Sequence, residues 1–194
     1  MTQLENSVPR RAVIKGAGLG AGLGLFAGVL PASAQTPAEA PDSGAIWSGV
    51  YWAKKGDVPL WMFRKRLGAP KAGEPARPVV FFVHGSSVSS RAFDLHVPGK
   101  GEYSVMNEFA RYGFDCWTMD HENYGKSGKT SGNSDIASGV EDLKAAAEVL
   151  ARETGQQKYH FVGESSGALR AGAYAMAAPE RIMSRSRLRM LWVR

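Results

Sequence analysis

The chain has 194 residues and a formal net charge of +6, a value often associated with nucleic-acid binding. The excess lies at the two ends: residues 1–34 carry three basic residues and one acidic residue, and residues 181–194 carry five arginines and no acid. Residues 35–180 hold 16 Lys and Arg against 17 Asp and Glu, so the charge of this part does not support nucleic-acid binding. Cys116 is the only cysteine, which excludes an intramolecular disulfide.

The first 34 residues have the features of a signal peptide. Residues 10–15, RRAVIK, are similar to a twin-arginine motif, and a glycine-rich apolar stretch follows over residues 16–30. Pro-Ala-Ser-Ala ending at Ala34 predicts cleavage after that residue. The stretch is shorter than the roughly 20 residues of a membrane span, so no stable span is expected after cleavage, and its glycines do not form a dinucleotide loop. We predict export by the twin-arginine machinery to the periplasm or medium, with a disordered leader at 35–45.

Apolar runs predict the strands of a sheet. Residues 46–53 and 60–66 flank a polar turn and are expected to form an antiparallel hairpin at the sheet edge. Residues 78–83, PVVFFV, are typical of a strand buried on both faces, and His84-Gly85-Ser86-Ser87 follows them directly. Residues 114–119 predict a further buried strand, which contains the cysteine.

Helices are expected between these strands. Residues 104–112 predict a short helix with Met106, Phe109 and Ala110 as its apolar stripe, and residues 140–152 predict a longer one. Strands that alternate with helices favour a largely parallel sheet. Asp135 or Ser138 is the candidate N-cap of the longer helix. Four tryptophans are expected in the core rather than on a ligand platform: Trp47, Trp52, Trp61 and Trp117.

The most informative motif is Gly163-Glu164-Ser165-Ser166-Gly167. It follows the apolar run 159–162 and precedes residues 168–177, a stretch of small residues suited to a helix packed close to a sheet. Gly-x-Ser-x-Gly between a strand and a helix is the pattern of a nucleophile elbow, a strained turn whose glycines avoid collisions with neighbouring backbone. The alternative is a tight turn of small residues without chemistry.

Together these motifs resemble the α/β-hydrolase superfamily over residues 47–181. The resemblance rests on the strand that ends in His-Gly, on the loop 120–128 and on the Gly-x-Ser-x-Gly turn, in the family's order. In the family's Asp-x-x-Gly-x-Gly-x-Ser loop this chain has Asn123 in place of the first glycine, a mild departure because Asn tolerates positive φ. The resemblance implies an α/β fold with a mostly parallel sheet and helices on both faces. It also implies that residues 79–83, 114–119 and 159–162 are neighbouring parallel strands.

The resemblance also implies roles for individual residues. Ser165 would be the nucleophile, and the backbone N–H groups of Ser86 and Ser166 would form the oxyanion hole. His84 would order the loop rather than take part in the chemistry. No metal-ligand cluster or phosphate loop is present in the sequence, so no cofactor is expected.

Two members of the family's catalytic triad have no counterpart after the nucleophile. In the family the order is Ser, acid, His, but the 29 residues that follow Ser165 contain one carboxylate, Glu180, and no histidine. Residues 182–194 form a basic tail where an apolar strand is expected. We therefore interpret residues 46–181 as the N-terminal half of a hydrolase domain, with the tail arising from a frameshift or an early cut; a genuine basic extension is the alternative.

Two functions stay open from the sequence. The first is an exported serine hydrolase that acts on an ester or related acyl bond of a small molecule through Ser165, inactive as this chain stands. Serine at the elbow disfavours the aspartate-nucleophile branches, and the lipase, esterase, thioesterase and serine aminopeptidase branches remain possible. The second is a non-catalytic remnant or binding protein that keeps the fold motifs.

Overall fold

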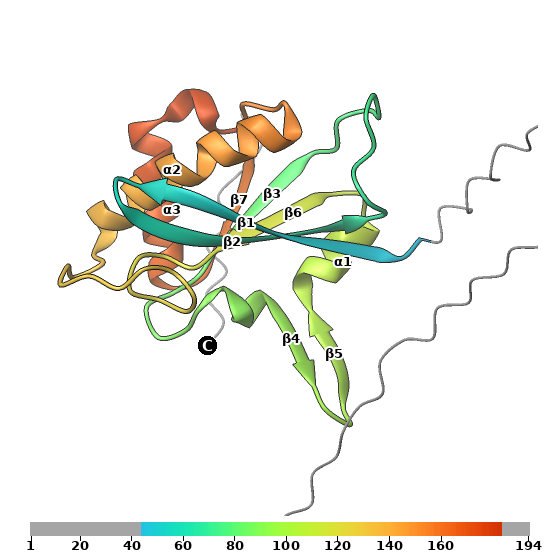
Figure 1. Ribbon diagram of the computed structural model, residues 1–194, viewed down its shortest axis with the longest axis horizontal. Coiled ribbons are helices and arrows are strands. Elements are labelled where there is room, and N and C mark those ends of the chain that lie inside the picture. The colour runs from blue at the N-terminus through green and yellow to red at the C-terminus, as the bar shows by residue number, and fades with distance from the viewer. Residues whose placement is uncertain (1–43, 184–194) are drawn as a thin grey trace, which may run out of the picture. The chain divides into compact units, whose positions relative to one another are not determined.

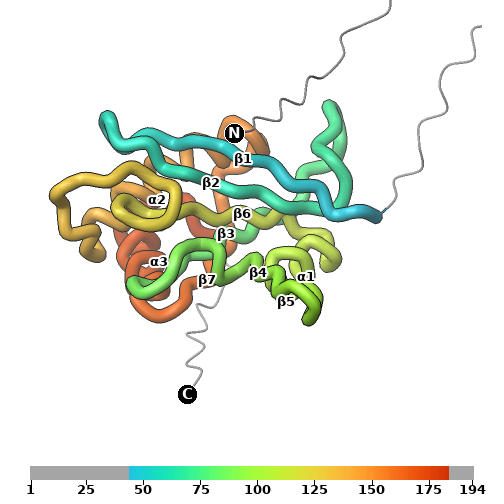
Figure 2. The backbone as a smooth tube through the Cα atoms, turned by 60° about the horizontal axis from the view of Figure 1, so that its bottom comes forward, coloured from blue at the N-terminus to red at the C-terminus, as the bar shows by residue number. Residues whose placement is uncertain are grey.

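Five strands form a mixed sheet in the computed structural model, which describes residues 44–183 (Figure 1). The strands are β1 (Ile46–Lys55), β2 (Val58–Leu67), β3 (Val79–Val83), β6 (Asp115–Met119) and β7 (His160–Gly163). Their order across the sheet is β1-β2-β6-β3-β7, which Figure 2 shows from a second side. β6, β3 and β7 run parallel, and β1 and β2 are antiparallel neighbours at one edge. The predicted parallel strands and the edge hairpin are thus confirmed.

Helices cover both faces of this sheet, as the apolar runs of β3 and β6 require. On one face, β-strand residues such as Phe81 and Trp117 pack against α2 (Ile136–Thr154) and α3 (Ser166–Ala177). On the other, Val80, Phe82 and Cys116 pack against α1 (Val105–Arg111) and the short 3-10 helix η1 (Ser90–Phe93). All ten residues of β3 and β6 are therefore buried.

The helices begin and end at recognisable caps. Ser104 accepts a hydrogen bond from the backbone N–H of Asn107 and starts α1. Asp135, the first of the two candidate caps, accepts from the N–H of Ser138, and α2 starts at Ile136, four residues before the predicted start at Val140. Gly155, with a φ of +68°, ends α2 in the left-handed conformation that favours glycine.

Two features differ from the sequence-based expectation. The hairpin of β4 (Asp94–Val97) and β5 (Gly101–Ser104), which lies between β3 and α1 along the chain and projects away from the sheet in Figure 1, was not predicted. Trp52 is wrong as a core residue: its side chain is 51% exposed, because β1 is an edge strand with one uncovered face. Trp117 is fully buried as expected.

The free edge of β7 is met at one point by the end of the described chain. After the short 3-10 helix η2 (Pro179–Arg181), Ile182 forms a parallel bridge with Tyr159. The N–H of Tyr159 donates to the carbonyl of Arg181 at 2.9 Å, and the N–H of Met183 donates to the carbonyl of Tyr159 at 3.1 Å. The chain therefore starts to pair with β7 at its amino end.

Other expectations fall on residues that are not described. The signal peptide over residues 1–34, most of the leader at 35–45 and residues 184–194 of the basic tail lie outside the described residues. Among residues 44–183, none of the helices combines the length and the apolar character needed to cross a membrane.

Candidate active site

Ser165 connects β7 to α3 in a backbone conformation that the surrounding turn imposes. Its φ is +53° and its ψ is −126°, a region that residues other than glycine rarely adopt. A Cβ at Gly163 would lie 2.5 Å from the backbone nitrogen of Ala168, and a Cβ at Gly167 would lie 2.1 Å from the carbonyl oxygen of Val83. The chain reverses from strand to helix only because these two positions lack a side chain. The predicted strand–helix turn at Ser165 is confirmed.

The loop after β3 lies against this turn. A Cβ at Gly85 would be 3.1 Å from the Cβ of Ser165, so a side chain there would press on the serine. The hydroxyl oxygens of Ser86 and Ser166 are hydrogen-bonded at 2.6 Å. The structure therefore brings the three predicted site residues together at the carboxyl edge of the parallel strands. The assignment of the two backbone N–H groups as an oxyanion hole stays a prediction.

His84 determines how the loop is oriented. The ring is fully buried, and its Nε2 accepts the backbone N–H of His121 at 3.1 Å. Nδ1 therefore carries the proton and donates to the carbonyl oxygen of Gly85 at 2.7 Å. That carbonyl and the N–H of Ser86 belong to one planar peptide unit and point in opposite directions. By holding the carbonyl, His84 directs the Ser86 N–H to the other side, in keeping with the ordering role expected for it.

A buried ion network holds His121 in turn. Both oxygens of the Asp142 carboxylate are used: one accepts from His121 Nδ1 at 2.9 Å and from the N–H of Glu122 at 3.1 Å, and the other pairs with Lys55 Nζ at 2.5 Å. The same ammonium lies 2.5 Å from the Glu122 carboxylate. The network thus connects Lys55, at the end of β1, through Asp142 on α2 to His121 on the loop after β6. The N–H of His121 in turn connects that loop to His84, beside Ser165.

Burial sets the protonation states of this network. Burial, and after it the neighbouring His121, lowers the pKa of His84 to about 4. Burial also lowers the pKa of His121, although the Asp142 carboxylate opposes that effect. For Asp142, burial favours the protonated form, but the hydrogen bonds from His121 and Lys55 outweigh it and hold its pKa below the usual value. At neutral pH both imidazoles are therefore neutral and the carboxylate is ionised.

Arg170 provides a second buried connection between the elbow helix and the loops. The residue is 1% exposed, and its guanidinium donates to the carbonyl oxygens of Ser134 at 2.8 Å and His84 at 3.3 Å. The carbon of the guanidinium lies 5.5 Å from the ring centroid of Tyr124. A Cβ at Gly139 would be 2.5 Å from Arg170 Cδ, so α2 must present a glycine where the arginine crosses it.

The loop after β6 is closed around Asp120. One oxygen of this carboxylate accepts from the N–H and hydroxyl of Ser90, and the other accepts from the N–H of Lys126. A Cβ at Gly125 would lie 2.0 Å from that carboxylate. Asn123 has a φ of +67°, which confirms that asparagine replaces glycine here in the left-handed conformation.

The sequence reasoning missed Asp142, Lys55 and Arg170. A signal was present for Asp142, which lies on the buried stripe of α2 between Gly139 and Ala146 at helical spacing. An acid within an apolar stripe requires a buried partner, and His121 or a lysine from the hairpin was the available choice.

All four histidines lie at positions other than that of the family's base. His84 and His121 are fully buried in the network above. His96 lies on the β4–β5 hairpin, and His160 begins β7, where its ring centroid is 6.0 Å from that of Phe114. Within residues 44–183, none stands at the position of the family's base, which follows the nucleophile in the chain.

Comparisons with known proteins agree with this geometry. The family model of the alpha/beta hydrolase fold matches residues 78–184. No curated protein sequence matches the chain. Among solved structures, the chain is similar to a predicted CIB-like hydrolase from Thermoplasma acidophilum, with 12% identity, a TM-score of 0.52, and coverage of 71% of this chain and 60% of that one.

Two further similar structures are hydrolases. An epoxide hydrolase from Vigna radiata has 18% identity and a TM-score of 0.51, with 71% of this chain and 36% of that one covered. A 2-hydroxy-6-oxo-6-phenylhexa-2,4-dienoate hydrolase from Rhodococcus sp. strain RHA1 has 17% identity and a TM-score of 0.52, with 71% and 44% covered. The chain thus spans between about a third and three fifths of the length of these structures. On the family match and the shared fold, the chain belongs to the α/β-hydrolase fold family.

Proposed function

We propose that the chain is part of an exported serine hydrolase that cleaves ester or related acyl bonds of a small molecule, with Ser165 as the nucleophile. The observation that carries the proposal is the strained turn of Ser165, which presents an exposed serine next to the Gly85-Ser86 loop. Strain of this kind is costly and persists where the surrounding structure enforces it, most often at functional sites.

A serine at the elbow favours acyl transfer over the chemistry of an epoxide hydrolase, although a protein of that name shares the fold. Ser165 Oγ would attack the carbonyl carbon of the substrate, and the N–H groups of Ser86 and Ser166 would stabilise the oxyanion of the tetrahedral intermediate. Departure of the alcohol or amine would leave an acyl-enzyme, which water hydrolyses. The hydrogen bond from His84 to Gly85 supports this role by fixing the direction of one of the donors.

The reaction also needs a general base, because a serine hydroxyl at neutral pH is a weak nucleophile. His84 uses both ring nitrogens in structural hydrogen bonds, and His121 is buried against Asp142. We therefore expect negligible turnover of p-nitrophenyl acetate by the 194-residue chain. Loss of a triad member typically leaves about 10³–10⁴-fold catalysis over water, far below a competent enzyme.

Labelling with a fluorophosphonate tests the nucleophile without requiring turnover. We expect slow modification of Ser165 that is faster with added imidazole, which substitutes for the missing base, and none in Ser165→Ala. Ser87→Ala is the matched control, since Ser87 is an exposed serine of the same loop. Intact mass spectrometry and peptide mapping locate the adduct. Equal labelling of Ser165→Ala, or no labelling of Ser165 under any condition, would favour the non-catalytic remnant instead.

Export forms a separate part of the proposal and rests on residues 10–15 and Ala34. Expressed in a bacterium with a twin-arginine pathway, the mature protein is expected to begin at Gln35. Replacing Arg10 and Arg11 with lysines should leave the protein in the cytoplasm, as measured by cell fractionation and N-terminal sequencing. If export continues after the double change, the general secretory route is the better explanation.

A further inference from the structure

The hairpin of β1 and β2 presents different side chains on its two faces, because successive residues of a strand point to opposite sides of the sheet. Tyr51 packs against the core beneath α2, so Val50 and Trp52 lie on the other face. Their partners across the hairpin are Phe63 and Trp61, in that order. Phe63 packs against the core that α1 covers. This cover does not extend along β1, where Val50 is 54% exposed and Trp52 is 51% exposed.

Four apolar residues form one surface, which we call the Trp52 face: Val50, Trp52, Trp61 and Phe63. The rings of Trp61 and Phe63 are stacked, with centroids 5.6 Å apart and planes at 10°. Aliphatic and aromatic side chains thus lie side by side on an uncovered part of the sheet. Exposed apolar residues that adjoin one another, unlike scattered ones, mark a surface for interaction.

Two lysines border the Trp52 face. Lys54 follows Trp52 by two positions and therefore lies on the same face, where it is exposed. Lys126, on the loop after β6, is also exposed and places its ammonium 4.5 Å from the centroid of the Trp61 ring. Among residues 44–183, neither of these ammonium groups pairs with a carboxylate. The border of the apolar surface is therefore positively charged.

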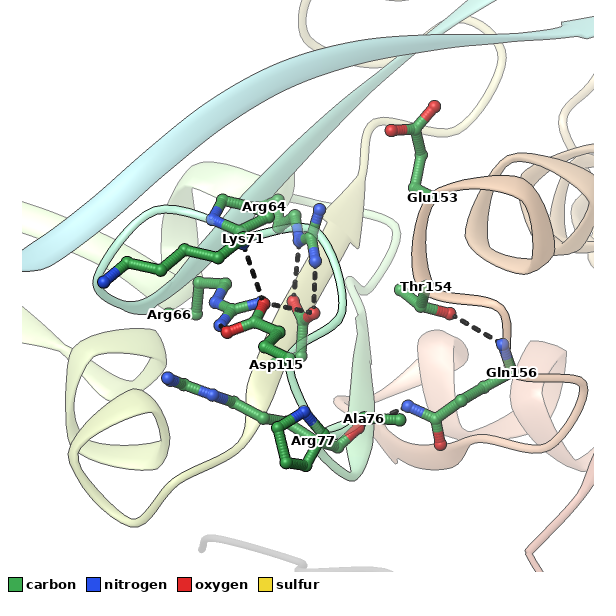
Figure 3. A pocket seen from close by; sticks show the side chains of 12 residues that line it. Arg64, Arg66, Lys71, Ala76, Arg77, Asp115, Glu153, Thr154 and Gln156 are labelled. Atoms are coloured by element: carbon green, nitrogen blue, oxygen red, sulfur yellow. Dashed lines mark hydrogen bonds and ion pairs between the residues drawn. The ribbon is translucent and has the colours of Figure 1, made fainter.

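The other cations of the hairpin are neutralised. Each of them pairs with a carboxylate: Lys55 with Asp142 at 2.5 Å, Arg64 with Asp115 at 2.5 Å, Lys65 with Asp94 at 2.6 Å and Arg66 with Glu74 at 2.5 Å. Figure 3 shows Arg64 paired with Asp115, and Arg66 close by, on the opposite face of the hairpin. The hairpin has a single acid of its own, Asp57, in the turn beyond the last strand pair. The two bordering lysines thus give the Trp52 face an unbalanced positive charge.

The Trp52 face is held in place at the edge of the sheet where Ser165 lies. The N–H of Trp61 donates to the hydroxyl of Ser127 at 2.8 Å, and its carbonyl accepts from the N–H of Asp120, which follows β6, at 2.9 Å. The N–H of Lys126 donates to the Asp120 carboxylate at 2.7 Å. A preformed surface of this kind loses little conformational entropy when it binds a partner.

We propose that the Trp52 face docks on the surface of an anionic lipid bilayer. Val50 and Trp52 would enter the interfacial layer, where tryptophan is favoured, and the two lysines would contact anionic headgroups. Charge complementarity selects this partner, because the lysines attract an anionic surface, whereas a second copy of the same face would bring like charges together. Val50 favours lipid over nucleic acid, since an aliphatic side chain offers no ring face for stacking. The docking does not depend on the chemistry of Ser165.

A dye at position 50 tests the docking on the 194-residue chain. Val50→Cys is labelled through its thiol with an environment-sensitive fluorophore, and the native Cys116 does not compete because it is buried. Vesicles of phosphatidylcholine mixed with phosphatidylglycerol should shift the emission to the blue, and vesicles of phosphatidylcholine alone should have a much smaller effect. Met176→Cys is the matched control, since Met176 is 86% exposed on α3, at the opposite face of the sheet. A dye there should not respond, so the readout distinguishes this face from any other part of the chain that binds lipid.

Variants of the Trp52 face should weaken the docking by predictable factors. In the labelled Val50→Cys chain, Lys54→Gln and Lys126→Gln should each raise the lipid concentration at half-maximal shift by about fivefold, the effect of one lysine near an anionic surface. Trp52→Thr should raise it by about tenfold, because a large apolar side chain no longer leaves water. Lys144→Gln removes an exposed lysine of α2 and is the matched control, which should leave this concentration unchanged.

Circular dichroism checks that each variant is folded; if Trp52→Thr is not, the two lysine variants decide alone. An unshifted dye at position 50, an equal shift at position 176, or a shift that the lysine variants leave unchanged would each overturn the proposal. A stronger response to a single-stranded oligonucleotide than to vesicles would also overturn it. So would a shift that grows with protein concentration in the absence of lipid, because a second copy of the chain would then cover the face.

Discussion

Replacing Gly167 with alanine is expected to destabilise the protein by about 3 kcal/mol, at the upper end of what overpacking costs. The added Cβ would lie 2.1 Å from the carbonyl oxygen of Val83 and 2.6 Å from that of His84. Both neighbours are backbone atoms of a buried strand end, so they cannot rotate away as a flexible side chain could. The start of α3 must move off β3, and the hydrogen bond between Ser86 and Ser166 should be lost with it.

Gly172→Ala is the matched control, because this glycine lies in the same helix and a Cβ there would meet no atom within 4 Å. It should stabilise the protein by about 1 kcal/mol, the difference in helix propensity between alanine and glycine. Urea denaturation followed by circular dichroism gives both values through the transition midpoints. A Gly167→Ala protein as stable as Gly172→Ala would contradict the close approach of α3 to β3.

The parts of the fold that follow from backbone geometry and apolar runs could be predicted from the sequence. β3, β6 and β7 were predicted within one residue at each end, because each is marked by a short, mainly apolar run; β3 and β6 are fully buried, and β7 is half-buried. The elbow was predicted because its glycines are required by contacts that any Gly-x-Ser-x-Gly turn makes. The start of α2 was predicted four residues late, at Val140, although Ile136 lies at i−4 from that residue and Asp135 provides the cap.

Other parts depend on contacts between distant residues. Asp142 and Lys55 are 87 positions apart, and nothing local in either segment indicates that they form a pair within the protein. Helical spacing places Asp142 on the buried stripe of α2, but it does not identify the partner of a buried charge, and Asp142 and Arg170 were overlooked for that reason. Trp52 was misplaced for a related reason: alternation along β1 does not tell which face of an edge strand a helix covers.

Replacing Asp142 with asparagine is expected to cost about 3 kcal/mol of stability or more at pH 7, as the loss of one partner of a buried ion pair typically does. The change removes the charge that faces Lys55 and leaves an amide where two hydrogen bonds are accepted. Glu141→Gln is the matched control: it removes the adjacent acid, whose side chain is 54% exposed and paired with Lys144. That change should alter stability by less than about 0.5 kcal/mol. Equal stabilities of the two variants would contradict a structural role for the buried network.

The pH dependence of the stability lost in Asp142→Asn distinguishes the effect of the Asp142 carboxylate from that of the two buried imidazoles. The folded-state pKa of Asp142 is held below 3.8, so its stabilising effect is fully present above pH 3.8 and is lost as the pH falls through the lower folded value. The difference in the free energy of unfolding between the unmodified chain and Asp142→Asn should therefore be constant from pH 7 to about 5 and shrink in stronger acid.

His84 affects stability over a different pH range, because its pKa falls from 6.5 to about 4 on folding. Between these values the unfolded chain binds a proton that the folded chain does not, so the stability of both proteins should decrease in parallel as the pH falls from 6.5 to 4. If the stability difference between the unmodified chain and Asp142→Asn already narrows above pH 5, the imidazoles and not the carboxylate account for it.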